Sequence, residues 1–253
     1  MAHKITVIGG ANADIAGAPS SELKLHESNI GKISISPGGV GRNIACELRD
    51  LGEEVSLITA FGDDAFGNML KESCRGIDIS SSLTLEGRSS STYLYITDET
   101  GDMYTAVNDM DITDEIRPPF AIDADAVVID ANIPEETIAY VCGLGIPVYA
   151  DPVSAVKAVK LIPYLDRITA VKPNEYEYEV LGDACQKTFV SRGSRGIRID
   201  NICVAPPEVF EGITNGCGDA ATAAIVFADL SGMSIRETAE FAVKYACGRI
   251  KKK

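Results

Sequence analysis

The chain has 253 residues, of which 45% are hydrophobic and 24% charged, as is typical of a globular protein large enough to bury a substantial core. Its 23 Lys and Arg residues stand against 37 Asp and Glu residues, so the formal net charge is −14. That charge argues against a nucleic-acid-binding protein and against docking on anionic lipid. An anionic substrate would need local help from backbone N–H groups or from a metal ion.

We expect a cytoplasmic protein. No apolar run approaches the roughly 18 residues of a membrane span, and the first residues lack the apolar core and cleavage site of a signal peptide. The seven cysteines are scattered without a CxxC pair, and there are two histidines. These counts argue against a disulfide framework and against a structural zinc site.

Runs of β-branched residues alternate with helical patterns, which predicts an α/β fold with a mostly parallel central sheet. The expected strands span 5–10, 55–60, 126–130, 148–150, 168–171 and 187–191. Helices are expected after residue 41, over 64–74, and from near Pro134, Asn174, Gly216 and Ser234. Five residues separate Leu181 from the strand that starts at Lys187. This gap is too short for an α/β crossover, so either the topology changes here or residues are absent.

Two regions lack helical spacing. Residues 91–107 form two β-rich runs around a turn at 98–102, which indicates a hairpin, and residues 30–36 are also β-like. We expect one domain over 1–253, with a small β lid formed by segments near 15–37 and 88–109.

The loop after the first strand reads GGANAD and ends in Asp14. Loops at the carboxyl ends of strands form binding sites in open α/β sheets, and a carboxylate there could accept hydrogen bonds from two ribose hydroxyls. The loop lacks the GxGxxG spacing of a dinucleotide site. A plain turn explains it as well.

The segment 36–43 reads SPGGVGRN and precedes a helix. Paired glycines, Gly38 and Gly39, let the backbone approach a polar ligand, and Asn43 offers both a donor and an acceptor for sugar hydroxyls. A turn followed by a helix cap accounts for the same residues.

Two further motifs follow later strands. In KPNEYE, Asn174 and Glu177 could hold Mg²⁺ through its waters at the phosphates of a nucleotide, or they could simply cap a helix. In SRGSRG, Ser194 and Gly196 could contact ATP, or they could form a hairpin turn.

The last motif, 216–219, reads GCGD and opens a helix whose alanines recur at helical spacing. The free N–H groups of a helix N-terminus make an anion pocket. Asp219 lies in the first turn, where it could take a proton from an attacking hydroxyl while the N–H groups stabilise a transferring phosphoryl group. An Asp in this position also complements the helix dipole without any catalytic role.

Taken in order, the motifs GGxNxD, GGxGxN, NxxE, GSxG and GxGD resemble those of the ribokinase-like family of sugar and nucleoside kinases over most of the chain. Stretches such as VIGGANADIAG and DPVSAVKAVK are similar to the subgroup that phosphorylates pseudouridine. The resemblance implies a three-layer fold with a β lid. It also implies ATP-dependent phosphorylation of the ribose 5′-hydroxyl of pseudouridine, with ATP and Mg²⁺ as cofactors.

The resemblance also implies the site residues. The catalytic set is Asp219 as base with Gly216, Cys217 and Gly218 as anion hole. The substrate set is Asp14, Asn12, Gly38, Gly39, Asn43, Asn108 and Asn132. The cofactor set is Asn174, Glu177, Ser194 and Gly196, with Glu177 facing Mg²⁺ through water. Homodimers that pair through the lid are common in this family.

The sequence departs from the family at two positions before the base. Ile213 stands where a carboxylate often helps to hold a monovalent cation, which argues against potassium activation. Cys217 replaces a small Ala but keeps its backbone N–H. The chain is also short for the family after Leu181 and at its C-terminus, where the adenine pocket is usually framed.

Two alternatives stay open at this stage, and a third is excluded. The protein could be another nucleoside or sugar kinase of the same fold, which a substrate panel would separate from the first hypothesis. It could be a non-catalytic binding protein for a sugar or nucleoside, although such a protein has no need of a base beside an anion pocket. A nicotinamide-dependent oxidoreductase lacks its fingerprint here.

Overall fold

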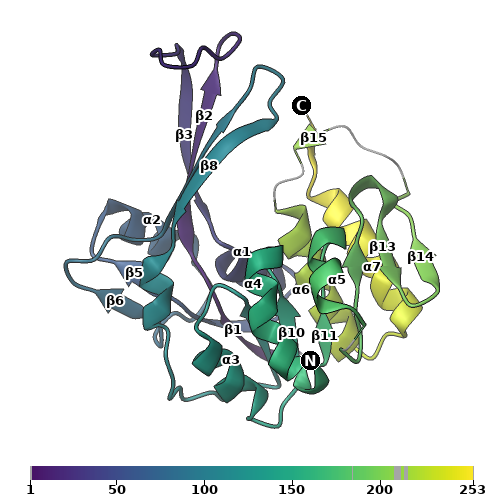
Figure 1. The fold of residues 1–253 in the computed structure, drawn as a ribbon. Coiled ribbons are helices and arrows are strands. Elements are labelled where there is room, and N and C mark those ends of the chain that lie inside the picture. The colour runs from purple at the N-terminus through teal and green to yellow at the C-terminus, as the bar shows by residue number, and fades with distance from the viewer. Residues whose placement is uncertain (1, 184, 208–211, 214–215, 253) are drawn as a thin grey trace.

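A five-stranded parallel sheet forms the centre of the molecule. Figure 1 shows the computed structural model, which describes residues 2–183, 185–207, 212–213 and 216–252. Its strands, in spatial order, are β11 (Ala170–Val171), β10 (Val148–Asp151), β9 (Ala126–Asp130), β1 (Lys4–Ile8) and β4 (Glu54–Ile58). Every neighbouring pair is parallel. The prediction of a mostly parallel α/β sheet is confirmed.

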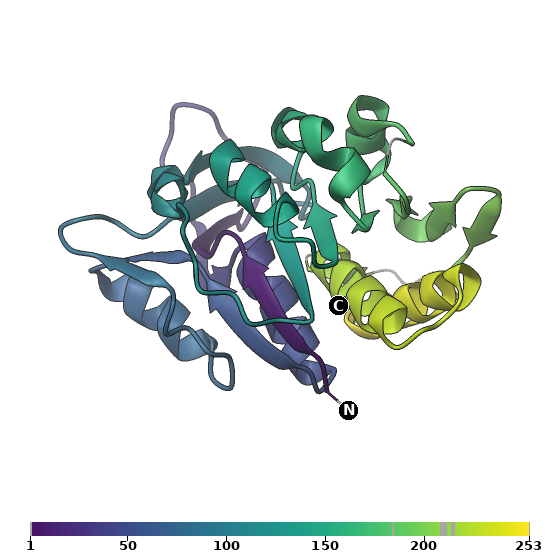
Figure 2. The same cartoon turned by 90° about the horizontal axis from the view of Figure 1, so that it is seen from below.

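Helices cover both faces of this sheet, which explains why its inner strands are apolar almost throughout. One face packs against α1 (Val40–Asp50), α6 (Cys217–Leu230) and α7 (Ile235–Gly248). The other packs against α3 (Glu135–Cys142), α4 (Ala155–Ala158), η2 (Val159–Arg167) and α5 (Glu175–Leu181). Figure 2, seen from below, shows α6 and α7 side by side along one edge of the body.

The predicted helix starts are confirmed because the residues named there are the caps. The N-cap residues of α3, α5, α6 and α7 are Pro134, Asn174, Gly216 and Ser234. Ser234 and Asn174 each form a capping box with the Glu three positions later. None of the helices in the described part of the chain combines the length and apolarity of a bilayer crossing.

The expected strand at 187–191 is wrong in its extent and in its sheet. Thr188 makes a single parallel bridge to Val171, and the chain then enters a separate antiparallel sheet. That sheet contains β12 (Val190–Ser191), β13 (Ile197–Ile199) and β14 (Ile202–Val204), with η3 (Gly193–Arg195) in its first turn. The short connection after Leu181 therefore marks a change of topology.

The remaining short elements support the edges of the body. They are β5 (Ala60–Gly62), α2 (Ala65–Ser73), β6 (Leu83–Leu85), η1 (Asp111–Glu115), β15 (Gly212–Ile213) and β16 (Lys251–Lys252). Strand β5 pairs with β6, and β15 pairs with β16. Asp64 is the N-cap of α2 and accepts a hydrogen bond from the Gly67 N–H.

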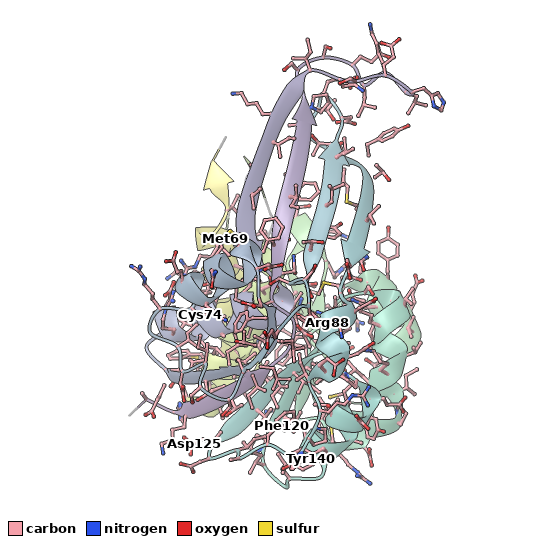
Figure 3. The ribbon with its side chains drawn as sticks, turned by 90° about the vertical axis from the view of Figure 1, so that its left-hand side faces the viewer. Met69, Cys74, Arg88, Phe120, Asp125 and Tyr140 are labelled. Carbon is pink, nitrogen blue, oxygen red and sulfur yellow. The ribbon has the colours of Figure 1, made fainter. Side chains whose placement is uncertain are left out.

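A second sheet stands away from the body, with α2 at its base (Figure 3). We call it the projecting sheet. In spatial order it consists of β3 (Gly31–Gly38), β2 (Asn12–Pro19), β7 (Thr92–Thr97) and β8 (Met103–Asp109). Strands β7 and β8 form the predicted hairpin. The four strands overlap the two segments in which the sequence predicts a lid.

One buried carboxylate joins three segments at the base of the projecting sheet. Asp130 Oδ2 accepts hydrogen bonds of 2.8 Å from the N–H groups of Gly10 and Gly41, and Oδ1 accepts one of 2.8 Å from the Asn132 N–H. The backbones pack so closely that a Cβ on Gly9 would lie 2.6 Å from Asp130 Oδ2. Asp130 therefore fixes the loop after β1 against the start of α1.

We predict that Asp130→Ala lowers the free energy of unfolding by about 3 kcal/mol or more, because three N–H donors lose their acceptor and an unpaired buried donor costs roughly 1–3 kcal/mol. Urea denaturation measures the change. The control is Asp123→Ala, since the 93% exposed Asp123 side chain pairs with Lys4 at the surface. That variant should stay within about 0.5 kcal/mol of the native protein. Equal effects of the two substitutions would contradict the prediction.

Candidate active site

Charged side chains gather where the central strands end. Asp130 and Asp151 are the last residues of β9 and β10, and Lys172 directly follows β11. All three are buried. The carboxyl edge of a parallel sheet is where open α/β proteins bind their ligands, so this edge is the candidate active site.

Helix α6 directs its N-terminus to this edge. Gly216 adopts the left-handed conformation, with φ of 83°, and the first intrahelical bond runs from the Ala220 N–H to the Gly216 carbonyl. The N–H groups of Cys217, Gly218 and Asp219 precede that bond and have no acceptor within the helix. The three N–H groups and the helix dipole suit the anion site that the sequence predicts, which stays a prediction.

The Asp219 carboxylate is half-buried in the first turn of α6. Asn43, from α1, donates its Nδ2 hydrogen bond to Asp219 Oδ2 over 2.7 Å. Burial, together with the nearby charges of Asp151 and Asp130, raises the pKa of Asp219 from 3.8 to about 7, against the opposing effects of Asn43 and Lys172. A carboxyl group that titrates near neutral pH suits proton transfer at that pH.

Lys172 supplies the positive charge of the site. Its Nζ lies 3.1 Å from Asp151 Oδ2, which also accepts a 2.7 Å hydrogen bond from Thr222 of α6. Burial lowers the pKa of Lys172, but the carboxylates of Asp151 and Asp219 outweigh it, so the pKa is raised overall. A Cβ on Gly218 would lie 3.3 Å from Lys172 Nζ. The ammonium group therefore borders the anion site.

Asn174 and Glu177 form the capping box of α5. Asn174 donates its N–H and its Nδ2 to the Glu177 carboxylate over 2.8 and 2.9 Å, and it accepts from the Glu177 N–H over 2.9 Å. Glu177 is only 4% exposed, and burial raises its pKa. Both carboxylate oxygens already accept one hydrogen bond, which fits a cation held through water better than a direct ligand. The described residues contain no group of three or more His, Cys, Asp or Glu side chains placed to hold a metal ion.

The predicted sugar-binding residues line the base of the projecting sheet. Asn12 donates to Asp14 Oδ1 over 2.6 Å, and the strand register puts Asp14, Tyr93 and Asn108 in one row across β2, β7 and β8. Residues directly opposite one another in a sheet point to the same face. Burial raises the pKa of Asp14. A Cβ on Gly38 would collide with the Asp14 carboxylate, so glycine here lets that carboxylate keep its position.

Two other predicted residues complete this side. Gly39 is the N-cap of α1 with φ of 98°, and a Cβ there would lie 2.9 Å from the Asn12 N atom. Asn132 is buried and accepts a 2.5 Å hydrogen bond from Lys157 Nζ. The Asn132 amide packs directly against the Gly10 backbone, since a Cβ on Gly10 would lie 2.9 Å from Asn132 Nδ2.

A pocket of about 300 Å³ opens on the other side of the α6 N-terminus. Its lining is mostly apolar and comes from the antiparallel sheet, α6 and α7. The residues are Ser191, Gly193, Ser194, Gly196, Ile197, Pro206, Cys217, Gly218, Ala221, Val243, Ala246, Cys247 and Ile250. Its volume is at the lower end of the range for small-molecule sites. Ser194 and Gly196 both line it, so the structure brings them beside Gly218.

The sequence analysis did not assign Lys172, Asp151 or the α7 residues of the pocket. Asp151 ends a buried strand, and Lys172 precedes the NxxE motif. A charged residue at the end of a strand indicates a binding site in an α/β sheet, so the sequence held a signal for both. The apolar residues of α7 are indistinguishable from core residues in the sequence. The potassium expectation stays a prediction, because Thr214, Asn215 and the Ile213 side chain lie outside the described residues.

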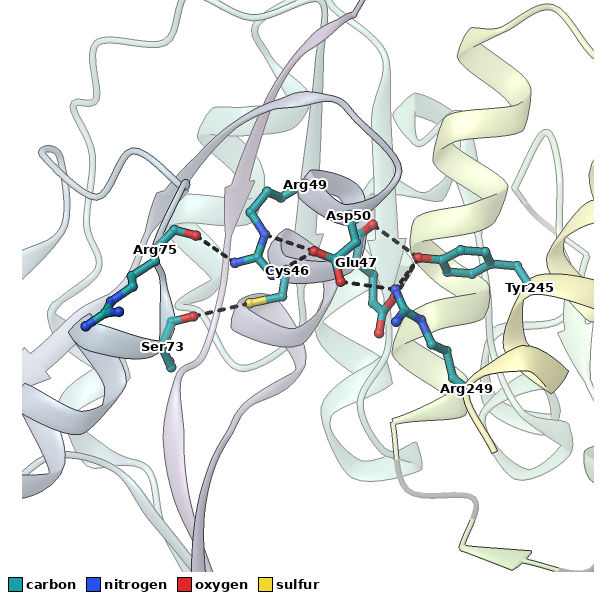
Figure 4. A network of polar contacts seen from close by, with 8 residues as sticks. All are labelled: Cys46, Glu47, Arg49, Asp50, Ser73, Arg75, Tyr245 and Arg249. Atoms are coloured by element: carbon teal, nitrogen blue, oxygen red, sulfur yellow. Dashed lines mark hydrogen bonds and ion pairs between the residues drawn. The ribbon is translucent and has the colours of Figure 1, made fainter. Parts of the chain in front are cut away.

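Helix α1, which carries Asn43, is tied to α7 by a polar network (Figure 4). Tyr245 donates its hydroxyl to Glu47 Oε2 over 2.7 Å, and Arg249 Nη2 lies 2.6 Å from the same oxygen and 3.2 Å from Asp50 Oδ2. The Arg249 guanidinium also lies over the Tyr245 ring at 5.0 Å. These contacts fix α1 against the helix that lines the pocket.

The model of the pfkB family of carbohydrate kinases matches residues 2–253. The chain therefore belongs to this family, and it is a kinase that transfers a phosphoryl group from ATP to a hydroxyl group. It is 33% identical to the pseudouridine kinase of Escherichia coli, over 94% of this chain and 87% of that protein. It is 32% identical to an uncharacterised sugar kinase of the same organism, over 96% of this chain and 76% of that protein.

Solved kinase structures also have a similar fold. The ribokinase structure from Thermotoga maritima matches with a TM-score of 0.82, covering 95% of this chain and 90% of that chain at 21% identity. The prediction of a three-layer ribokinase-like fold is confirmed, and so is the family resemblance.

We predict that Asp219→Asn stabilises the protein at neutral pH. The pKa of Asp219 is higher in the folded chain, about 7, than its ordinary value of 3.8. The folded state therefore binds the proton more tightly, and the free energy of unfolding falls as the pH rises from about 4 to about 7. The Asn variant avoids this loss. Its advantage should grow between about pH 5.5 and 7, by up to about 1.4 kcal/mol per pH unit, and then level off.

Urea denaturation of both proteins across this pH range measures the difference. Asp123→Asn, at an exposed carboxylate, is the control and should leave the pH dependence of stability unchanged. A stability difference that is flat from pH 5.5 to 8 would contradict the assigned environment of Asp219.

Proposed function

We propose that this kinase transfers the γ-phosphoryl group of ATP to the ribose 5′-hydroxyl of pseudouridine. The position of Asp219 carries the proposal: its carboxylate lies at the N-terminus of α6, beside the pocket bordered by Gly218, and Asn43 reaches it over 2.7 Å. The 33% identity to the pseudouridine kinase of Escherichia coli supports this choice of substrate.

Asp219 acts as the general base in this proposal. It accepts the proton of the 5′-hydroxyl as the oxygen attacks the γ-phosphorus. With a pKa of about 7, much of Asp219 is ionised at neutral pH and can accept that proton, and the acid formed is stable at this pH. A group of this kind contributes roughly 10²- to 10⁴-fold to the rate.

The N–H groups of Cys217, Gly218 and Asp219 and the Lys172 ammonium group stabilise the negative charge on the transferring phosphoryl group. Phosphoryl transfer depends mainly on such positioning and charge stabilisation. The pocket bordered by Ser194, Gly196 and α7 holds the adenine and ribose of ATP. The formal net charge of −14 makes this local positive potential necessary for binding a polyanion.

The site suits a Mg²⁺ ion that is held through its waters near Glu177 and Asn174. When bound with ATP, the ion would supply positive charge beside the phosphates. Glu177 and Asn174 orient its waters, because their capping box holds the Glu177 carboxylate in place.

On the sugar side, the nucleoside is bound by Asp14, Asn12, Asn43, Asn108 and Asn132, with Gly38 and Gly39 allowing close approach of the backbone.

We further propose that the chain is a single domain in which the projecting sheet is a lid. Closure of this lid over the sugar would exclude water and limit ATP hydrolysis. The cytoplasmic location stays a prediction.

A second substrate class has its own support. The identity to the uncharacterised sugar kinase, 32%, is almost the same as that to the pseudouridine kinase. The site chemistry described above suits any ribose-like sugar that presents a primary hydroxyl. Another nucleoside or a free sugar is therefore the alternative substrate.

A substrate panel tests the proposal. With MgATP present, ADP release is measured for pseudouridine, uridine, adenosine and ribose. We expect the highest kcat/KM for pseudouridine, because it alone of the two uracil nucleosides presents a free N1–H, and a site built to bond that group rejects an analogue without it. A higher kcat/KM for any other member of the panel would assign the enzyme to the alternative.

Asp219→Asn belongs in the same assay. We expect kcat to fall roughly 10²- to 10⁴-fold while calorimetry shows nucleoside binding largely retained. Turnover near that of the native enzyme would remove Asp219 from the role of base.

We also propose that the kinase forms a homodimer through the outer face of the projecting sheet. The strand register puts Ile35, Ile15, Leu94 and Val107 in one row on the face opposite Asp14. In the monomer, Ile35 is 51%, Leu94 41% and Val107 68% exposed. A contiguous exposed apolar patch of this kind marks a protein–protein contact, and the same face of a second copy is its natural complement.

Ile35→Glu should convert the dimer to a monomer, because dimerisation would bury the unpaired Glu carboxylate of each copy against the apolar row of the other. Analytical ultracentrifugation measures the mass. Val156→Glu is the control: Val156 is 83% exposed on α4, away from the projecting sheet, and its variant should sediment as the native protein does. A monomeric native protein at micromolar concentration would refute the dimer.

A further inference from the structure

The side chain of Arg42 joins three elements beside the candidate base. Its Nε donates to Ser73 Oγ at the end of α2 over 2.7 Å, and its Nη1 donates to the Pro37 carbonyl of β3 over 3.3 Å. The same Nη1 donates to Asn43 Oδ1 over 2.8 Å. Side chains of neighbouring residues in a helix normally point apart. The long arginine side chain makes this contact by turning toward Asn43.

The Asn43 amide is therefore held at both ends. Its oxygen accepts from Arg42, and its Nδ2 donates to Asp219 Oδ2. A primary amide can turn over and exchange the places of its oxygen and nitrogen. The two orientations have opposite effects on a carboxyl group: an N–H donor stabilises the carboxylate, whereas an amide oxygen stabilises the protonated acid, which can donate to it.

We propose that Arg42 is a positioning residue that fixes the Asn43 amide with its NH₂ group toward Asp219. The guanidinium group has only donors. The turned amide would direct its NH₂ group at that cation and remove the Asn43 donor from the carboxylate. Arg42 thereby selects the orientation that keeps Asp219 ionised and able to accept a proton. The role as base rests on the proposed function, but the orientation itself does not.

The anchor of Arg42 lies outside the helix that carries Asn43. Ser73 Oγ, which accepts from Arg42, itself donates to the Leu70 carbonyl over 2.5 Å. That bond fixes the rotamer of the Ser73 hydroxyl, so its lone pair faces the arginine. The guanidinium is thus oriented by the C-terminal turn of α2 and by β3, and it holds the amide from a fixed position.

Several charged or titratable groups surround Asp219 besides this chain of contacts. They come from β9, β10, the segment after β11 and α6 itself, and they are Asp130, Asp151, Lys172 and Cys217. Arg42 also faces Asp14, whose pKa it lowers against the larger effect of burial. A kinetic pH profile alone would mix Asp14 with Asp219, so the test needs a direct observation of the Asp219 carboxyl group.

The test is a ¹³C NMR titration of carboxyl groups in protein labelled at aspartate, without nucleotide or nucleoside, with Asp219→Asn identifying the Asp219 signal. We expect Arg42→Ala to raise the titration midpoint of Asp219 by on the order of one pH unit. Below the midpoint, the ionised fraction of Asp219 would then be about tenfold smaller than in the native protein. In the nucleoside kinase assay, kcat should fall by a similar factor near pH 6 and recover above pH 8. Millimolar guanidinium should partly restore the native midpoint.

A double substitution separates this role from a long-range charge effect. If Arg42 acts through the amide, Arg42→Ala should add no further shift in the background of Asn43→Ala. A shift of the Asp219 midpoint that persists there would overturn the proposal, because it would show that the guanidinium charge acts directly. An unchanged midpoint in Arg42→Ala alone would overturn it as well.

Arg49→Ala is the matched control for the fold. Arg49 is also on α1 and also reaches the end of α2, where it donates to the Arg75 carbonyl over 2.7 Å, and it pairs with Asp50 at 2.8 Å (Figure 4). Its loss should change thermal stability without moving the Asp219 midpoint. Equal midpoint shifts in the two arginine variants would refute the specific role of Arg42. If the native protein phosphorylates no nucleoside or sugar, the proposed function fails, while the titration still decides the role of Arg42.

Discussion

The chemistry of this site depends on four carboxyl groups that share the surroundings of one buried lysine. Asp130, Asp151, Glu177 and Asp219 converge on the carboxyl edge of the sheet, and Lys172 lies among them. Burial raises the pKa values of Asp130, Glu177 and Asp219, and the nearby charge of Asp151 raises them further. The same burial and repulsion that raise the pKa of Asp219 to about 7 also oppose a polyanionic nucleotide. The backbone N–H groups of α6 and a divalent cation are the two sources of positive potential that resolve this conflict.

Asp130 gives the site its shape as well as part of its charge. Because its oxygens bind the N–H groups of Gly10 and Gly41, the loop that leads to Asp14 and the helix that carries Asn43 are built around one side chain. The two halves of the sugar side are therefore fixed relative to each other before any substrate arrives. Because its loss would leave those backbone donors unpaired, Asp130 serves stability and the geometry of the site together. Asp219 differs, since burial of its carboxylate lowers stability at neutral pH and is kept for the proposed function.

The sequence predicted those features that depend on local rules. Helix starts at Asn174 and Ser234 followed from capping chemistry, and the hairpin around residues 98–102 followed from β-rich runs flanking a turn. The strand at 187–191 was wrong because its apolar residues suit either a parallel or an antiparallel sheet, and only tertiary packing decides which. Family motifs led to Asp219 and Asn43. They did not lead to Lys172 or Arg42, whose importance lies in contacts between residues far apart in the chain.

Helix α1 is where these separate contacts meet. On one flank, Arg42 and Arg49 tie it to the end of α2, and on the other, Glu47 binds Tyr245 and Arg249 of α7. Helix α7 lines the pocket proposed for the nucleotide, and Asn43 on α1 contacts Asp219, the proposed base. A helix held on both flanks cannot move its amide relative to Asp219 without breaking charged hydrogen bonds, which are among the stronger ones in proteins. The precision that phosphoryl transfer demands is therefore built into the scaffold, and the surroundings of the base do not have to be assembled by the ligands.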